Sequence, residues 1–227
     1  PLHPFNIKGI IWYQGESNRG QEELYGRLMP AFVKDLRQKW GLGDFPFYYV
    51  QIAPFQYDGV DKTSSAKLRE VQLRNMNEIP NSGMAVTLDI GEKTKIHPAE
   101  KEKVGNRLAY WALAKTYNKN NFGYSGPIYK SIEIKGNKIY VNFSNAPKGV
   151  APLETELPDF EIAGEDKIFY PAKAVIEAKS GRLGVSSPQV PNPVAVRYAY
   201  KNFVVGSLFD VYGLPASSFR SDNWEIK

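Results

Sequence analysis

Cysteine is absent from this chain of 227 residues. Disulfide bonds, thiolate zinc sites and a cysteine nucleophile are therefore excluded. Histidine is almost as scarce, since only His3 and His97 are present. A metal centre built on histidine would need both of them, and His3 stands at the very start of the chain. We therefore expect no metal site.

Long hydrophobic runs are also lacking. No apolar stretch approaches the roughly 18 residues that a membrane-spanning helix needs, so no membrane partner is expected. The net charge is +5, but lysine and arginine are spread along the chain without a run of five or six basic residues. Because a nucleic-acid-binding face usually needs a clustered basic patch, no nucleic-acid partner is expected either.

The first 120 residues alternate between strand and helix patterns. Short apolar runs over 8–13, 45–52 and 84–90 predict buried parallel strands. Three helices are predicted between and after them: one capped by Ser17 or Asn18 and kinked or split at Pro30, one over 64–77, and one that begins at Pro98. This order predicts a parallel sheet covered by helices.

The pattern changes near residue 123. Residues 126–227 show no convincing helix, and Gly136-Asn137 between two alternating segments predicts a hairpin. Short β-rich runs recur over 131–134, 138–143, 160–162, 174–176, 183–185 and 194–200. The chain thus predicts an α/β domain over 1–122, followed by an antiparallel β-sandwich over 123–227, with the boundary within 118–127.

A polar segment, Trp12-Tyr-Gln-Gly-Glu-Ser-Asn18, follows the first predicted strand. Ligands of open α/β sheets bind at the carboxyl ends of the strands. At that edge Gln14 could donate an amide hydrogen to a developing oxyanion, although the segment could equally be only a turn and a helix cap. Ser17 is disfavoured as a nucleophile, because Arg19 stands where the hydrolase elbow Gly-x-Ser-x-Gly needs its second glycine.

A second polar segment, residues 89–98, follows the third predicted strand and contains His97. A lone histidine in a loop is more often structural than catalytic. Two features favour catalysis here: the strand ends in Asp89, and a predicted helix follows the histidine and would hold it on a rigid element. A histidine in that place can act as a general base near neutral pH.

Together these segments resemble the sialate O-acetylesterase family of the SGNH hydrolases. The resemblance runs along nearly the whole chain. It rests on 7–18 (Ile-Lys-Gly-Ile-Ile-Trp-Tyr-Gln-Gly-Glu-Ser-Asn), Leu68-Arg-Glu70 with Gln72, Ile96-His-Pro98, Val104-Gly-x-Arg-Leu-Ala109, Phe160-Glu-Ile-Ala-Gly-Glu165, Pro193-Val-Ala-Val-Arg-Tyr198, and Gly213-Leu-Pro-Ala-Ser217 with Phe219, Arg220 and Asp222.

The resemblance implies a partial SGNH-hydrolase fold, with a flavodoxin-like, three-layer parallel sheet. It also implies a carbohydrate esterase that hydrolyses O-acetyl esters on sugars by serine and histidine chemistry, without a cofactor. His97 matches the family's histidine, and Gln14 matches its side-chain oxyanion donor. Gly15 and Glu16 belong to the same block, where Glu16 is expected to order the loop rather than to react.

Two departures from the family pattern matter. The family's nucleophilic serine stands in a Gly-Gln-Ser-Asn block that this sequence lacks, so we expect an upstream segment of the same protein to carry it and this chain alone to be inactive. Members often have Asp two residues before the histidine, whereas this chain has Lys95 there and Thr94 before it. Asp89, Glu92 or a backbone carbonyl are then candidates to orient His97.

Several alternatives stay open. The substrate could be an O-acetylated sialic acid, acetylated xylan or another glycan, and the chain could be a non-catalytic sugar-binding module or only a structural β-sandwich partner. Arginines and tyrosines of the second half suit sugar recognition or ordinary sheet faces (Arg197, Tyr198, Tyr200 and Arg220). The segment 213–222 is expected to form a seam between the domains. From the resemblance, a secreted or periplasmic location is expected.

Overall fold

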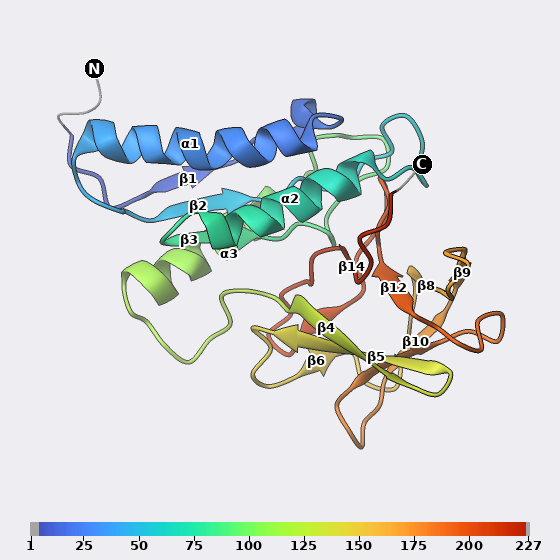
Figure 1. The fold of residues 1–227 in the computed structure, drawn as a ribbon. Helices are drawn as coiled ribbons and strands as arrows, with labels where there is room; N and C mark the ends of the chain where they lie inside the picture. The colour runs from blue at the N-terminus through green and yellow to red at the C-terminus, as the bar shows by residue number, and fades with distance from the viewer. Residues whose placement is uncertain (1–4, 226–227) are drawn as a thin grey trace.

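Three layers make up the N-terminal half of the computed structural model, which describes residues 5–225 and leaves His3 outside (Figure 1). Strands β1 (Ile10–Trp12), β2 (Phe47–Val50) and β3 (Ser82–Ala85) form a parallel sheet in that order. Helices α1 (Glu22–Trp40) and α2 (Ser64–Glu78) cover one face, and α3 (Lys101–Trp111) covers the other. The predicted parallel sheet with its covering helices is confirmed.

The central strand β2 shows why its sequence run is apolar throughout. Phe47 and Tyr49 pack against the layer of α1 and α2, whereas Tyr48 and Val50 pack against α3. All four side chains are at most 3% exposed. A strand covered on both faces needs no polar alternation, which is typical of parallel sheets.

The helix boundaries correct three predictions. Helix α1 begins only at Glu22, after a 3-10 turn over Glu16–Asn18, and neither Ser17 nor Asn18 caps it. It continues unbroken through Pro30 to Trp40, so the predicted split is wrong. The third helix starts at Lys101 instead of Pro98 and ends in a π-helical turn over Ala112–Thr116. The predicted helix over 64–77 is confirmed as α2.

The third strand is shorter than predicted. It ends at Ala85, and residues 86–90 turn away from the sheet, with the Ile90 amide donating to the Thr87 carbonyl at 3.3 Å. Thr87 is held instead by a hydrogen bond from its hydroxyl to the carbonyl of Gln51 at 2.6 Å. The apolar run over 84–90 therefore forms the end of β3 and a turn, and not a longer strand.

The second half consists of antiparallel sheets, and no helix occurs in residues 126–225. A five-stranded sheet has the order β4-β5-β11-β10-β7, a four-stranded sheet has the order β14-β12-β8-β9, and β13 pairs with β6. Their bounds are β4 Ile128–Lys135, β5 Lys138–Ser144, β6 Val150–Ala151, β7 Glu156–Leu157, β8 Phe160–Ala163, β9 Phe169–Pro171, β10 Lys173–Ile176, β11 Leu183–Ser186, β12 Ala195–Tyr198, β13 Phe209–Asp210 and β14 Phe219–Arg220.

One hydrophobic core joins the two larger sheets of this half. Val141 of β5 and Leu183 of β11 come from the five-stranded sheet, and Ile162 of β8 and Val196 of β12 from the four-stranded one. Gly136-Asn137 connects β4 to β5, so the predicted hairpin is confirmed. That the sheets form a sandwich, and that separate domains meet at residues 122 and 123, stay predictions; the change from helix to strand falls within 117–127.

The C-terminal segment runs back along the helical layer, as its predicted place at a seam requires. The Ser217 hydroxyl accepts a hydrogen bond from the Gln51 side chain at 2.8 Å, and the Ser218 hydroxyl accepts one from Arg69 at 3.0 Å. In Figure 1 the red ribbon of this segment lies between α2 and the strands of the second half.

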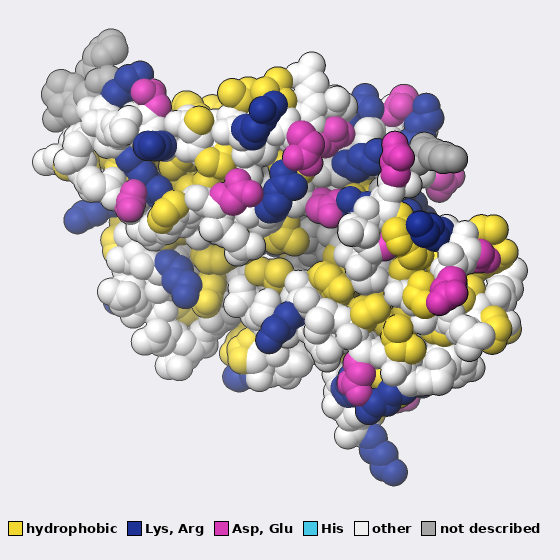
Figure 2. All heavy atoms as spheres, in the orientation of Figure 1, with side chains coloured by type: hydrophobic (Ala, Val, Ile, Leu, Met, Phe, Trp, Pro, Cys, Tyr) yellow, Lys and Arg dark blue, Asp and Glu magenta, His cyan; other side chains and the backbone are white. Residues whose placement is uncertain are grey.

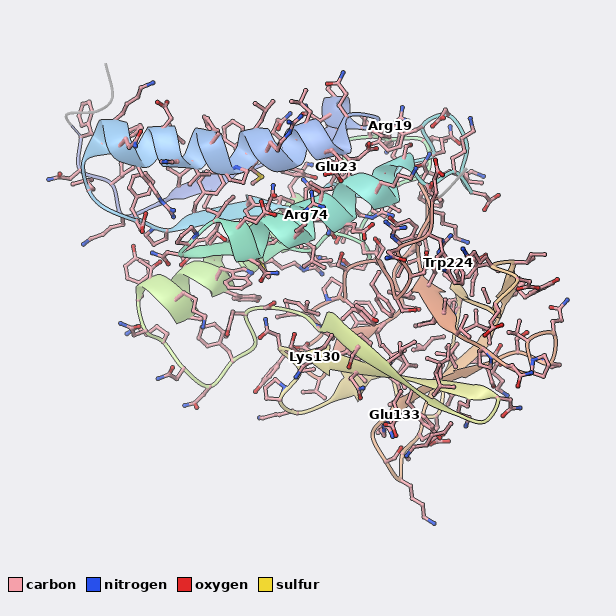
Figure 3. All side chains as sticks on the ribbon, viewed as in Figure 1. Arg19, Glu23, Arg74, Lys130, Glu133 and Trp224 are labelled. Atoms are coloured by element: carbon pink, nitrogen blue, oxygen red, sulfur yellow. The ribbon has the colours of Figure 1, made fainter. Side chains whose placement is uncertain are left out.

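Charge on the face drawn in Figure 2 is mixed, with acidic and basic side chains interspersed over the helical layer. Arg74 of α2 and Glu23 of α1 illustrate this, since they lie side by side with 3.1 Å between Nη2 and Oε2 (Figure 3). None of the helices in residues 5–225 is long and apolar enough to cross a membrane.

Candidate active site at the carboxyl edge of the parallel sheet

The turn after β1 fixes the side chain of Gln14. Its amide nitrogen donates a hydrogen bond to Asn18 Oδ1 at 2.7 Å, and the Tyr25 hydroxyl of α1 donates to its backbone carbonyl at 3.3 Å. A carboxamide nitrogen carries two hydrogens. The second one has no acceptor among residues 5–225, so Gln14 is free to stabilise an oxyanion at this edge.

Gly15 is a packing requirement of the same turn. A Cβ added there would lie 2.9 Å from Ile52 Cγ2 and 3.0 Å from Gln72 Nε2. Gln72 of α2 is itself fully buried, and its side-chain oxygen accepts the backbone N–H of Ile52 at 3.0 Å. Gly15 thus lets the turn rest directly on α2 and on the end of β2.

Glu16 lies beside two buried phenols. Burial first, and the Glu16 carboxylate second, raise the pKa of both Tyr13 and Tyr57 to about 12. Neither phenol hydroxyl has a hydrogen-bond partner in the described part of the chain. The side chain of Glu16 makes no hydrogen bond or ion pair with residues 5–225, so its expected loop-ordering role stays a prediction.

His97 lies in the loop after β3, and its side chain is exposed. Among residues 5–225 no group hydrogen-bonds its imidazole. The neighbouring Pro98 is buried, which anchors the backbone directly after the histidine. The imidazole is therefore open to a proton donor arriving from solvent or from another segment, as a general base must be.

Asp89 does not orient the histidine in this structure. Both of its carboxylate oxygens accept hydrogen bonds from Arg107 of α3, each at 2.7 Å, and the two side chains are only 10% and 8% exposed. Arg107 also donates to the carbonyl of Val86 at 2.8 Å. The pair therefore ties the turn after β3 to α3 and supports the His97 loop from its base.

The loops after the three strands meet at one edge. Because β1, β2 and β3 are parallel, Gln14 and His97 both follow carboxyl ends, with the position of β2 between them. The backbone N–H of Gln56 donates to the backbone carbonyl of Lys93 at 3.3 Å, and Lys101 Nζ lies 4.8 Å from the centroid of the Tyr13 ring. The sheet thus brings the two predicted catalytic residues to one edge without direct contact between them.

Comparison with known proteins decides the family. Residues 2–114 match the family model for carbohydrate esterases, sialic acid-specific acetylesterases. This part of the chain belongs to that carbohydrate esterase family. Over 161 residues the chain is 30% identical to the mouse and human sialate O-acetylesterases, and the match covers 63% of this chain but only 30% and 31% of those proteins.

The architecture of this chain is shared with a solved structure. A carbohydrate acetylesterase from Xanthomonas citri is 37% identical and superposes with a TM-score of 0.89. The likeness covers 99% of this chain and 52% of that one, so it includes the β-rich half as well as the α/β half. The chain spans about half of that structure's length and about a third of the length of the curated relatives.

Helix α2 carries a buried arginine that joins it to the second half, and the sequence alone did not reveal this contact. Arg69 is fully buried and has no acidic partner among residues 5–225, and burial lowers the pKa of its guanidinium to about 10. It donates to the Ser218 hydroxyl at 3.0 Å and to the Lys201 carbonyl at 2.6 Å. The only hint in the sequence was that Leu68-Arg-Glu70 forms one of the blocks that carry the resemblance.

The arginines of the second half are committed to structural pairs. Arg197 binds Asp222 through two hydrogen bonds of 2.9 and 2.8 Å, and Arg220 binds Glu70 of α2 at 3.0 and 3.2 Å. The Tyr200 hydroxyl also donates to Glu70. Since these acids already use the guanidinium groups, the structure favours the sheet-and-seam interpretation over sugar recognition.

No cluster of three or more metal-binding side chains occurs within residues 5–225. The chemistry that the described residues can supply at this edge is a proton acceptor, His97, and an amide donor, Gln14. Ser17 at this edge is exposed, and no described side chain hydrogen-bonds its hydroxyl, so no group within residues 5–225 activates it as a nucleophile.

Proposed function

We propose that this chain is part of a carbohydrate O-acetylesterase in which His97 moves the proton and Gln14 binds the oxyanion. The observation that carries the proposal is the edge itself: an exposed imidazole and an amide with a free hydrogen follow parallel strands whose loops are joined. The family match of residues 2–114 supports the same reaction.

In the proposed reaction a serine hydroxyl attacks the acetyl carbonyl, and His97 accepts its proton. The oxyanion of the tetrahedral intermediate takes a hydrogen bond from the Gln14 amide. When the intermediate collapses, His97 returns the proton to the sugar oxygen, and the sugar leaves as an alcohol. Water then attacks the acetyl-serine with His97 as base, and acetate is released.

We place the serine on a segment upstream of this chain. Strand β1 lies at an edge of the sheet, and Ile11 at its middle is 67% exposed. A hollow of about 180 Å³ lies beside it on the α3 side, lined by Ile11 and Tyr48, and another of about 220 Å³ lies on the α1 side, lined by Trp12 and Gln14. An open, apolar strand edge favours pairing with a further strand.

The proposed substrate is an O-acetylated sialic acid or a related sugar. The family model and the mammalian relatives are described as sialic acid esterases, whereas the Xanthomonas structure is described as a carbohydrate acetylesterase. Acetylated xylan or another glycan is therefore the second candidate. A secreted or periplasmic location, and the lack of nucleic-acid and membrane partners, remain predictions from the sequence.

Acetate release by two proteins tests this proposal: the present chain, and the same chain extended upstream through the serine-bearing segment. We expect turnover of p-nitrophenyl acetate only by the extended protein, with O-acetyl sialic acid and acetylated xylan then separating the candidate substrates. Turnover by the present chain of confirmed mass would contradict the upstream serine and would return Ser17 to consideration. An extended protein that binds sugars but releases no acetate would support a sugar-binding module.

A further inference from the structure

The loop that carries His97 is closed by one side chain. Glu92, five residues before the histidine, accepts the backbone N–H of Ala99, two residues after it, with 2.8 Å between Oε1 and the nitrogen. The bond therefore encircles the histidine within a ring of eight residues. Its acceptor is a carboxylate, and charge-assisted hydrogen bonds of this kind are stronger than neutral ones.

The remaining anchors of this loop leave the histidine itself unheld. Asp89 binds Arg107 at the start of the loop, and in its middle the Lys93 carbonyl accepts a hydrogen bond from the backbone N–H of Gln56. No described group holds the imidazole directly. The direction of the ring is thus set by the backbone on either side of it, and the bond between Glu92 and Ala99 is the contact that joins those two sides.

The carboxylate is well suited to this place. Ala99 lies just before the first turn of α3, where backbone N–H groups are unpaired and negative charge is favoured. The hydrogen bond from Ala99 is the largest cause of a lowered pKa at Glu92, and the charge of Lys95 is a smaller one. The carboxyl group is therefore ionised at neutral pH. Lys95 Nζ lies 3.4 Å from the other carboxylate oxygen.

The residue at position 95 decides which acid can act in this loop. Lys95 occupies the position, two residues before the histidine, at which the resemblance expects an acid, and a lysine ammonium group cannot accept a hydrogen bond from the imidazole. In this chain that side chain is 70% exposed and turns to Glu92. Glu92 therefore bonds to the backbone of this loop, whereas no described acid bonds to the imidazole ring.

We infer that Glu92 is a positioning residue of the proposed esterase, which holds His97 in its reactive direction by closing the loop on the Ala99 amide. The inference rests on the proposed function, because it assigns a role toward the general base. It predicts that the acceptor oxygen of residue 92 matters more than its charge.

The test uses the extended, serine-containing protein with Glu92→Ala and Glu92→Gln. We expect Glu92→Ala to lower kcat about tenfold with little change in KM, because small misplacements of a catalytic group cost rate rather than binding. Glu92→Gln keeps an acceptor oxygen and should recover most of the rate. Glu100→Ala is the matched control, since it removes an exposed acid next to Ala99 whose ion pair within the described part of the chain is with Lys103, and it should leave kcat unchanged.

Amide hydrogen exchange at Ala99 supplies a readout that does not depend on turnover. Protection should fall in Glu92→Ala and persist in Glu92→Gln and Glu100→Ala, with the melting temperature checking that each variant is folded. A parent rate in folded Glu92→Ala, or equal losses in the alanine and glutamine variants with Ala99 still protected, would overturn the inference. If His97→Ala were fully active, the proposed function would fail instead, while the exchange result would still stand.

Discussion

The buried phenols around the sheet differ in whether their hydroxyl groups have partners. Tyr49 is 0% exposed, and its hydroxyl donates to the Gln72 carbonyl at 2.6 Å. The hydroxyl of Tyr13 is also buried but has no partner among residues 5–225. A buried hydrogen bond contributes to stability, whereas a buried hydroxyl without a partner only loses its hydration.

Two phenylalanine substitutions separate these cases. Tyr49→Phe should lower the free energy of unfolding by about 0.5–1.5 kcal/mol, because it removes the buried hydrogen bond to the Gln72 carbonyl. Tyr13→Phe should leave the free energy of unfolding unchanged or raise it slightly. Urea denaturation of both variants provides the measurement. An equal loss in Tyr13→Phe would show that its hydroxyl has a partner, such as a bound water molecule.

The pairing of Asp89 shows how far single residues can be predicted from sequence. Its position after a strand and before His97 indicated a site residue, and the sheet does bring it to the same edge. Its partner, Arg107, lies 18 residues away on α3 and shows no pattern that links it to Asp89. Strand order was enough to predict that Gln14 and His97 follow the carboxyl ends of the sheet, while their catalytic roles stay predictions. Side-chain partners depend on tertiary contacts that the sequence does not display.

At the scale of secondary structure, regular elements with local signals were predictable. Helix α2 and the β4–β5 hairpin follow from helical spacing and from Gly136-Asn137. The prediction of a strand over residues 86–90 was wrong. The Thr87 hydroxyl donates to the Gln51 carbonyl and Arg107 donates to the Val86 carbonyl, so this apolar run forms a turn. Asn18 does not cap α1, because its side-chain oxygen accepts the hydrogen bond from Gln14 instead.

Two glycines test how the turn after β1 depends on α2. Gly15→Ala would press a methyl group against Ile52 and Gln72, and should lower the free energy of unfolding by about 1–3 kcal/mol. Gly105 lies inside α3 with no atom within 4 Å of an added Cβ. Gly105→Ala should instead raise it by about 0.5–1 kcal/mol, because alanine favours helix. Thermal or urea unfolding measures both.

The two substitutions are expected to change the free energy of unfolding in opposite directions. A Gly15→Ala variant as stable as the parent would mean that the turn can move away from α2 at no cost. In the extended protein, such a shift would also displace Gln14, so a stable but slow variant would separate the position of the turn from the stability of the fold.

At the scale of the whole molecule, the two halves are joined by polar contacts between residues far apart in the sequence. Ser217 and Gln51 are 166 residues apart, and Arg69 and Ser218 are 149 apart. The resemblance located the blocks, but no local pattern showed that they bind one another. The seam could be predicted as a place and not as a set of bonds.

Arg69 and Arg74 on the same helix test the seam. Arg69→Ala removes a fully buried side chain that bridges to Ser218 and Lys201, and should cost about 3 kcal/mol or more of unfolding free energy. Arg74→Ala removes an exposed side chain paired with Glu23, and should cost less than about 1 kcal/mol. Chemical denaturation checks this difference. Equal effects would contradict a seam that contributes to stability.

The proposed reaction depends on His97 as the group that carries the proton, and acetate release by the extended protein measures that role. Comparison of the parent with His97→Ala is decisive, with His3→Ala as the control for the other histidine. We expect His97→Ala to lose at least about a hundredfold in kcat while His3→Ala keeps the parent rate. A His97→Ala variant that releases acetate as fast as the parent would exclude His97 as the general base.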